Sequence, residues 1–183
     1  MNIATSPTRE KYPLSTKKVL KKTIVSLSVW FVILLIILLV VAIPMFGSGY
    51  SSTPFLFTMF VLILIFFVIA LIIYLYQQWY YNVYYYNLTP DFIFIKKGPI
   101  TPREITIPYE IVQDVYVDQD IFDRIFGLYD VHLSSATISS GMEAHIDGVE
   151  KTAADGLRQE LLTTVNLKIG KTTPIPTPAP TQP

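Results

Sequence analysis

The stretch Phe55–Tyr86, FLFTMFVLILIFFVIALIIYLYQQWYYNVYYY, decides the fold of this chain because its character changes partway along. Residues 55–76 carry no charge and form a helix of roughly 33 Å, enough to cross a hydrocarbon core of about 30 Å. Trp79, Tyr80 and Tyr81 follow, and such amphipathic aromatics prefer the headgroup level of a bilayer as membrane-interface anchors. The sequence therefore predicts a transmembrane helix over 55–77 that leads into a domain over 78–168.

A second apolar run lies upstream and predicts a first transmembrane helix over 23–45. Its residues 23–43 carry no charge, whereas a cleaved signal peptide has an apolar region of only about 7–15 residues followed by a small-residue cleavage site. Residues 46–54 are rich in Gly, Ser and Pro and predict a short external turn. The two helices are expected to form a hairpin with both chain ends on one side of the membrane.

The charge distribution orients this hairpin. Residues 1–22 contain six Lys or Arg and one acid, and Pro7 and Pro13 discourage a continuous helix there, which predicts a flexible basic tail. Lys and Arg beside a span stay on the cytoplasmic side. We therefore expect a multi-pass protein of the cell membrane with two spans and with both termini in the cytoplasm.

Several classes of protein are disfavoured by what the sequence lacks. The 183 residues include no cysteine, so disulfides, thiol catalysis and Cys-ligated zinc are excluded. The two apolar runs contain no Asp, Glu, Lys, Arg or His, the groups that proton relays and ion pathways require. A transporter is therefore not expected, and no nucleic acid, cofactor or small-molecule substrate is indicated.

The region after the aromatic cluster alternates apolar and polar residues in short segments separated by turns. A period of two describes antiparallel strands with one face on a core and one in water. The expected strands are Val83–Leu88, Phe92–Ile95, Ile105–Ile107, Val115–Val117, Tyr129–Leu133 and Glu143–Ile146. One helical turn is expected over 120–127 and a loop over 134–141.

A C-terminal helix is expected to close the domain. Asp147 and Glu150 have the spacing of a capping box. The apolar residues that follow recur every four positions, as on an amphipathic helix: Val149, Ala153, Leu157, Leu161 and Val165. Gly156 inside it costs about 1 kcal/mol relative to Ala. Residues 169–183 are rich in Pro and Thr and predict a disordered tail.

Several short motifs, in this order, carry a resemblance to a known family. They include Ile93–Gly98, Ile105–Pro108, Ile111–Val115, Phe122–Leu128 and Ile146–Val149. With the preceding hairpin, they make residues 23–167 similar to the bacterial and archaeal PH-domain membrane proteins, the YdbS-like family. The resemblance implies a membrane-anchored α+β protein in which a PH-like antiparallel β-sandwich or barrel, capped by a C-terminal helix, follows two transmembrane helices. It implies no enzymatic activity and no catalytic, cofactor-binding or metal-binding residues.

Three bases near a predicted turn, Lys96, Lys97 and Arg103, are candidates for binding lipid headgroups, as the basic hairpins of eukaryotic PH domains do. Residues 80–168 hold seven bases and thirteen acids, however, and this net charge of −6 repels an anionic surface.

The two histidines and a group of acids are the remaining candidates. His132 and His145 could serve a metal-dependent hydrolase only if they converge from separate strands, and their spacing matches no known signature. The acids could form a docking face or a weak cation site: Asp114, Asp118, Asp120, Asp123 and Asp130.

These patterns favour a membrane-anchored scaffold or adaptor. The expected partners are membrane lipids and either another protein or a second copy of the chain. The alternatives are a sensor of anionic lipid headgroups and, more remotely, a metal-dependent hydrolase.

Overall fold

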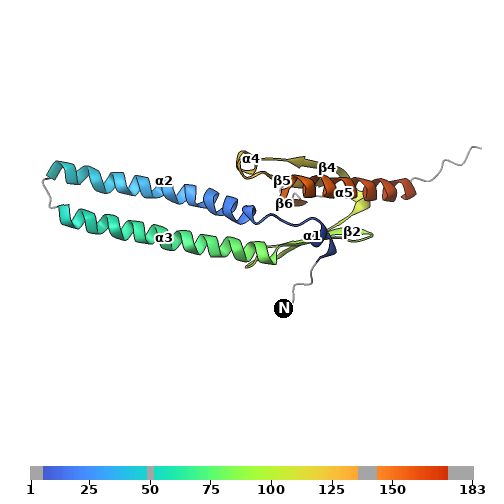
Figure 1. The fold of residues 1–183 in the computed structure, drawn as a ribbon, viewed down its shortest axis with the longest axis horizontal. Helices are drawn as coiled ribbons and strands as arrows, with labels where there is room; N and C mark the ends of the chain where they lie inside the picture. The colour runs from blue at the N-terminus through green and yellow to red at the C-terminus, as the bar shows by residue number, and fades with distance from the viewer. Residues whose placement is uncertain (1–5, 49–51, 136–143, 173–183) are drawn as a thin grey trace, which may run out of the picture. The chain divides into compact units, whose positions relative to one another are not determined.

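The computed structural model describes residues 6–48, 52–135 and 144–172 and divides the chain into two compact units (Figure 1). One unit, residues 16–83, is the helical hairpin. The other, here called the β domain, combines residues 1–15 with residues 84–183. Each unit is described by itself.

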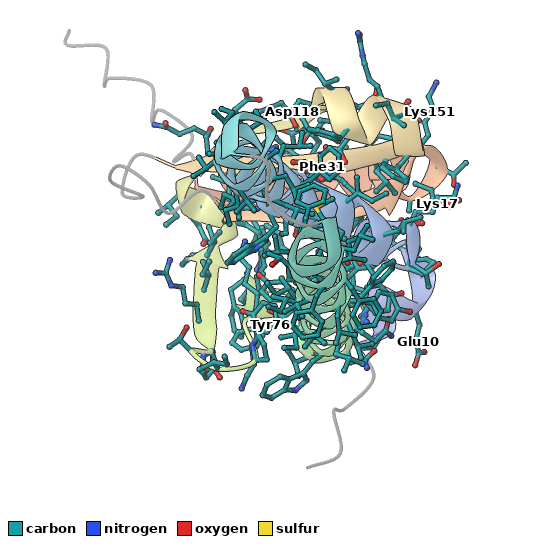
Figure 2. All side chains as sticks on the ribbon, turned by 90° about the vertical axis from the view of Figure 1, so that its left-hand side faces the viewer. Glu10, Lys17, Phe31, Tyr76, Asp118 and Lys151 are labelled. Carbon is teal, nitrogen blue, oxygen red and sulfur yellow. The ribbon has the colours of Figure 1, made fainter. Side chains whose placement is uncertain are left out.

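The helical hairpin consists of α2 (Lys17–Ser48) and α3 (Ser52–Val83), which lie side by side (Figure 1). Phe31 of α2 points between the two helices in Figure 2, where its ring meets that of Phe66 edge-on at 6.4 Å between centroids. Both helices are long and apolar enough to cross a membrane, over Lys17–Ile43 and Phe55–Val83. Their length and composition suggest membrane association.

The helices are longer than the sequence patterns indicate. The turn expected over 46–54 is wrong at both ends, because α2 runs to Ser48 and α3 begins at Ser52; residues 49–51 lie outside the described part. Pro54 is the third residue of α3, where a backbone N–H has no intrahelical partner to lose. The helix also continues past residue 77 to Val83, so residues 78–83 are not the start of the β domain.

Two three-stranded antiparallel sheets form the β domain. The first, the β1–β3 sheet, contains β1 (Tyr85–Leu88), β2 (Phe92–Lys97) and β3 (Arg103–Pro108) in that order. The second, the β4–β6 sheet, contains β4 (Val112–Asp118), β5 (Leu128–Ser135) and β6 (Ala144–Glu150). The predicted strands are thus present with shifted ends, except that Val83 belongs to α3. Most of the loop expected over 134–141 lies outside the described residues.

Two short helices connect strands, and one long helix covers a sheet. A 3₁₀ turn, η1 (Tyr109–Ile111), joins β3 to β4, and α4 (Ile121–Phe126) joins β4 to β5 where a helical turn was expected. The helix α5 (Lys151–Thr172) packs on the second sheet, as Figure 1 shows. Its predicted apolar positions are all buried: Ala153, Leu157, Leu161 and Val165. Because α5 continues to Thr172, residues 169–172 are helical, and the disordered tail expected from residue 169 is wrong for these four residues.

The start of α5 differs from the prediction for a tertiary reason. Asp147–Glu150 extend β6 instead of capping a helix. Gly148 has φ 78°, a left-handed conformation that suits glycine, and its amide donates to Asp130 at 2.7 Å. Val149 pairs with Tyr129 of β5 and with Leu14, far away in the sequence. These pairings outweigh the local capping signal.

The expected flexible tail over 1–22 is wrong for residues 6–22. Residues 17–22 begin α2. Pro7–Lys11 form a short helix, α1, whose N-cap Ser6 accepts a hydrogen bond from the amide of Arg9. Beyond it, Leu14 forms a β-bridge with Val149, and the Ser15 amide donates to the Gly148 carbonyl at 2.9 Å. The segment 6–15 is therefore part of the β domain.

Candidate functional site

The basic residues of the β2–β3 turn lie on two different faces. Lys97 and Arg103 are direct partners across the strands and therefore share a face. Lys96 is opposite Glu104 on the other face, with Nζ 2.6 Å from Oε1. The structure thus brings together two of the three predicted headgroup-binding residues and turns the third away, beside a carboxylate that offsets its charge.

This turn has a defined place in the β domain. Tyr85, the first residue of β1, pairs with Lys96, so the turn over residues 98–102 lies at the same end of the sheet as Tyr84, which directly follows α3. The Tyr84 hydroxyl and Lys97 Nζ both donate to the carbonyl of His145, at 3.0 and 3.4 Å. We call this end of the β domain, with Tyr84 and the turn over 98–102, the junction end.

One face of the β4–β6 sheet carries the predicted histidines. His132 of β5 pairs with Tyr116 of β4 on one side and with His145 of β6 on the other. The rings stack in a row, with centroids 5.0 Å apart for Tyr116 and His132 and 5.3 Å for the two histidines. The strands therefore bring the two histidines together, which sequence spacing alone does not show.

A carboxylate completes this row. His132 Nε2 lies 3.1 Å from Asp118 Oδ1, so a protonated His132 would form an ion pair there. In the three described ranges of the chain, no group of three or more His, Asp or Glu residues is arranged to hold a metal ion. The metal-dependent hydrolase stays a prediction.

The five predicted acids separate into two sets. Asp114 and Asp118 are exposed on β4 and Asp130 lies opposite Asp118 on β5, so these three share a face. Asp120 and Asp123 instead form a capping box at α4: each side chain accepts a hydrogen bond from the other residue's backbone amide. The docking face expected from the sequence therefore involves three acids, together with Tyr116, and we call it the acidic face.

The short helix α4 exposes two apolar side chains that the charge pattern of the sequence does not indicate. Ile121 and Ile125 are 77% and 71% exposed. Their spacing of four places both on one face of the helix. The sequence could have indicated this exposed pair, because two isoleucines four residues apart lie within the helical turn predicted over 120–127.

The N-terminal segment adds a second network that the sequence does not reveal. Ser6 and Thr8 each donate a hydroxyl to Asn87 Oδ1 at 3.0 Å, and Arg9 donates to the Tyr84 carbonyl at 2.6 Å. The Tyr86 hydroxyl donates to the carbonyl of Tyr12. These bonds hold α1 against β1, at the edge of the first sheet.

Glu160 of α5 ties the other side of this segment. Its Oε2 accepts hydrogen bonds from Lys11 Nζ at 2.6 Å and from the Tyr12 hydroxyl at 2.8 Å. The bond from Lys11 lowers the pKa of Glu160, whereas burial raises the pKa of Tyr12. Burial also raises the pKa of Tyr109 to about 12, so these two tyrosines stay neutral at physiological pH.

The predicted membrane-interface aromatics all lie on α3. Trp79 is half exposed, and the Tyr80 ring centroid lies 6.0 Å from Lys18 Nζ. Because successive helical residues point in different directions, Trp79, Tyr80 and Tyr81 surround the helix rather than form a strand face. Their role as interface anchors stays a prediction.

Two long apolar helices followed by two three-stranded sheets and a C-terminal helix define a PH-like protein with two possible membrane spans. The chain belongs to the bacterial PH domain family, whose sequence profile matches residues 18–164. Members of this family are generally non-enzymatic. Comparisons with curated proteins and with solved structures find no match.

Proposed function

We propose that this protein is a membrane-anchored scaffold that presents its PH-like domain to a protein partner at the cytoplasmic surface. One observation carries the proposal: only Tyr84 separates the end of α3 at Val83 from the start of β1 at Tyr85. A domain joined so closely to a membrane span has no need of lipid binding for recruitment. The function that remains is to hold another protein at the membrane.

The acidic face supports a partner of positive charge. Asp114, Tyr116 and Asp118 are exposed on β4, which pairs only with β5 among the strands of the described residues. An edge strand can pair with an extended segment of another chain, and tyrosine is favoured at protein interfaces. The partner is therefore a basic segment, either of another protein or of a second copy.

Site-specific crosslinking in native membranes tests this proposal. A photoreactive amino acid at Tyr116 should capture a partner, and the adduct should disappear when Asp114→Lys and Asp118→Lys reverse the charge nearby. The matched control is the same amino acid at Thr106, an exposed position on β3 of the other sheet. Equal capture at both positions, or capture that survives the charge reversal, would contradict the proposal.

A second candidate function is the binding of anionic lipid headgroups, which the shared face of Lys97 and Arg103 at the junction end favours. Titration of the full chain in detergent with short-chain phosphatidylglycerol should then show binding that weakens with salt. Lys97→Glu should abolish it, whereas Lys96→Glu, on the opposite face, should leave it intact. Equal effects of the two variants would exclude a site on the Lys97 face.

A further inference from the structure

The N-terminal segment, residues 6–15, lies across three elements of the β domain. Its helix α1 packs along β1, Tyr12 meets α5 at Gly156, and Leu14 forms a bridge with Val149 of β6. Among the described strands, β1 and β6 are each at an edge of their sheet. An edge strand is a surface on which an extended peptide can dock. In this protein the chain's own N-terminal segment occupies that surface.

The outer edge of β1 is hydrogen-bonded by side chains of the segment. The Thr8 hydroxyl accepts a hydrogen bond from the Leu88 amide at 2.9 Å and donates to Asn87 Oδ1 at 3.0 Å. Arg9 donates to the Tyr84 carbonyl at 2.6 Å. The strand edge therefore binds particular hydroxyl and guanidinium groups, as a peptide-binding surface does.

The segment contributes little to the apolar core. Leu14 is its one buried apolar side chain, whereas the other buried apolar residues of the β domain lie between Tyr84 and Val165. A part of a protein with few buried apolar contacts opens locally while the rest stays folded. The segment can therefore leave its surface without unfolding the β domain.

The surface beneath the segment offers mainly hydrogen-bond acceptors. They are a side-chain amide oxygen, two backbone carbonyls and two carboxylates: Asn87 Oδ1, the carbonyls of Tyr84 and Gly148, Glu150 and Glu160. Residues 80–168 hold seven bases and thirteen acids, a net charge of −6. A ligand that matches this surface is therefore rich in hydroxyl and basic donors.

We propose that this surface is a peptide-binding site whose resident ligand is the N-terminal segment, and that an extended basic segment of a partner protein displaces it. The resident segment defines the ligand: hydroxyl residues and a base along β1, a tyrosine over Gly156, and an apolar residue at the edge of β6. The acidic face lies on β4, at the opposite edge of the β4–β6 sheet from β6. The peptide site is therefore a second site, and it does not rest on the function proposed above.

Charge favours a partner protein over a second copy. Glu10 is an exposed acid within the resident segment, so its charge has the same sign as the net charge of the domain. A partner segment with a base at this place would bind more tightly. The segment of a second copy would only repeat the contacts that each copy already makes within itself, and association costs translational and rotational freedom. Exchange between copies therefore gains no contact.

Fluorescence anisotropy of a labelled peptide with the sequence of residues 6–15 tests the site. The protein is the full chain in detergent, and the variant Tyr12→Ala/Leu14→Ala releases the resident segment without altering the surface beneath it. We expect the peptide to bind this released variant at least about tenfold more tightly than wild type, because only chains whose own segment has left can bind it. Circular dichroism verifies the fold.

Matched substitutions locate the bound peptide. In the released variant, Gly156→Ala should weaken binding, because a Cβ there would overlap the tyrosine ring, whereas Gly170→Ala should not, because a Cβ there meets nothing within 4 Å. A peptide with Glu10→Lys should bind more tightly than the native peptide, and salt should reduce the difference. Equal affinity of the two peptides would overturn the basic class of the ligand. Absence of binding, equal binding to wild type, or binding insensitive to Gly156→Ala would overturn the site.

Hydrogen exchange of the unaltered chain supplies a measurement that needs no substitution. The amides of Ser15 and Leu88 donate across the contact between the segment and the domain, to the Gly148 carbonyl and to Thr8 Oγ1. They should exchange through an opening that leaves the central strand β5 protected. Exchange of these amides only together with β5 would overturn the proposal. Dimers of wild type with the released variant, in place of peptide binding, would overturn the assignment to a partner protein.

Discussion

At Gly156 of α5, the missing side chain leaves room for a residue 144 positions earlier. A Cβ at this position would overlap the Tyr12 ring at Cε1 and lie 3.2 Å from two further ring carbons. Glycine lowers the stability of a helix by about 1 kcal/mol relative to alanine. At position 156 this loss is accepted because the absent side chain leaves space for Tyr12 to pack against α5. Without the Tyr12 contact, alanine would be the better residue.

The variant Gly156→Ala tests this explanation. We expect it to displace Tyr12 and to increase protease cleavage within residues 6–15, although the same change normally stabilises a helix. Gly170→Ala is the matched control, because a Cβ there meets nothing within 4 Å; it should leave cleavage unchanged. If Gly156→Ala protects the segment as well as wild type does, the packing explanation is wrong.

At the scale of elements, the docking of the N-terminal segment on α5 depends on the ionised Glu160. Its folded-state pKa lies below the ordinary value of 4.5, chiefly because Lys11 donates a hydrogen bond to it. A lowered folded-state pKa contributes stability above the ordinary value, and this stability is lost as the pH falls through the folded-state pKa. Acid should therefore loosen residues 6–15.

Hydrogen exchange of residues 6–15, corrected for the intrinsic effect of pH, measures this loss. Lys11 and Glu160 are 60% and 36% exposed, so solvent screens the pair and only a small loss of protection is expected. Glu160→Gln should slightly reduce protection at pH 7, and the difference from wild type should vanish once acid has protonated Glu160. A Glu110→Gln control, at an exposed site of η1, should change neither. A difference that persists in acid would exclude the proposed charge dependence.

For the whole molecule, the basic residues of the N-terminal region predict which side of the membrane holds the β domain. A reporter fused after Gln182 should be active only in the cytoplasm, and one inserted at Gly49, between the two helices, only outside. Fusions that remove residues 173–183 serve as a control for the Pro-rich end. External activity after Gln182 would reverse the orientation and with it the proposed cytoplasmic partner.

Much of the fold could be predicted because it depends on local periodicity. The uncharged runs indicate the helices of the hairpin by length alone, and alternation in segments such as Tyr129–Leu133 indicates strands. The four-residue repeat through Leu157 and Leu161 indicates the buried face of α5. Each pattern reports only which side of its own element is apolar.

The tertiary structure alone decided the features that join distant residues. Asn87 accepts a hydrogen bond from Ser6, 81 positions earlier, so part of the predicted basic tail belongs to the β domain. Val149 pairs with Leu14, so the residues predicted to cap α5 instead form the end of β6. The register likewise separates Lys96 from Lys97 and stacks His132 on His145. Such contacts depend on how elements meet in space. The sequence by itself determined the two apolar helices, the strands and the closing helix, because their patterns arise from residues that are neighbours along the chain.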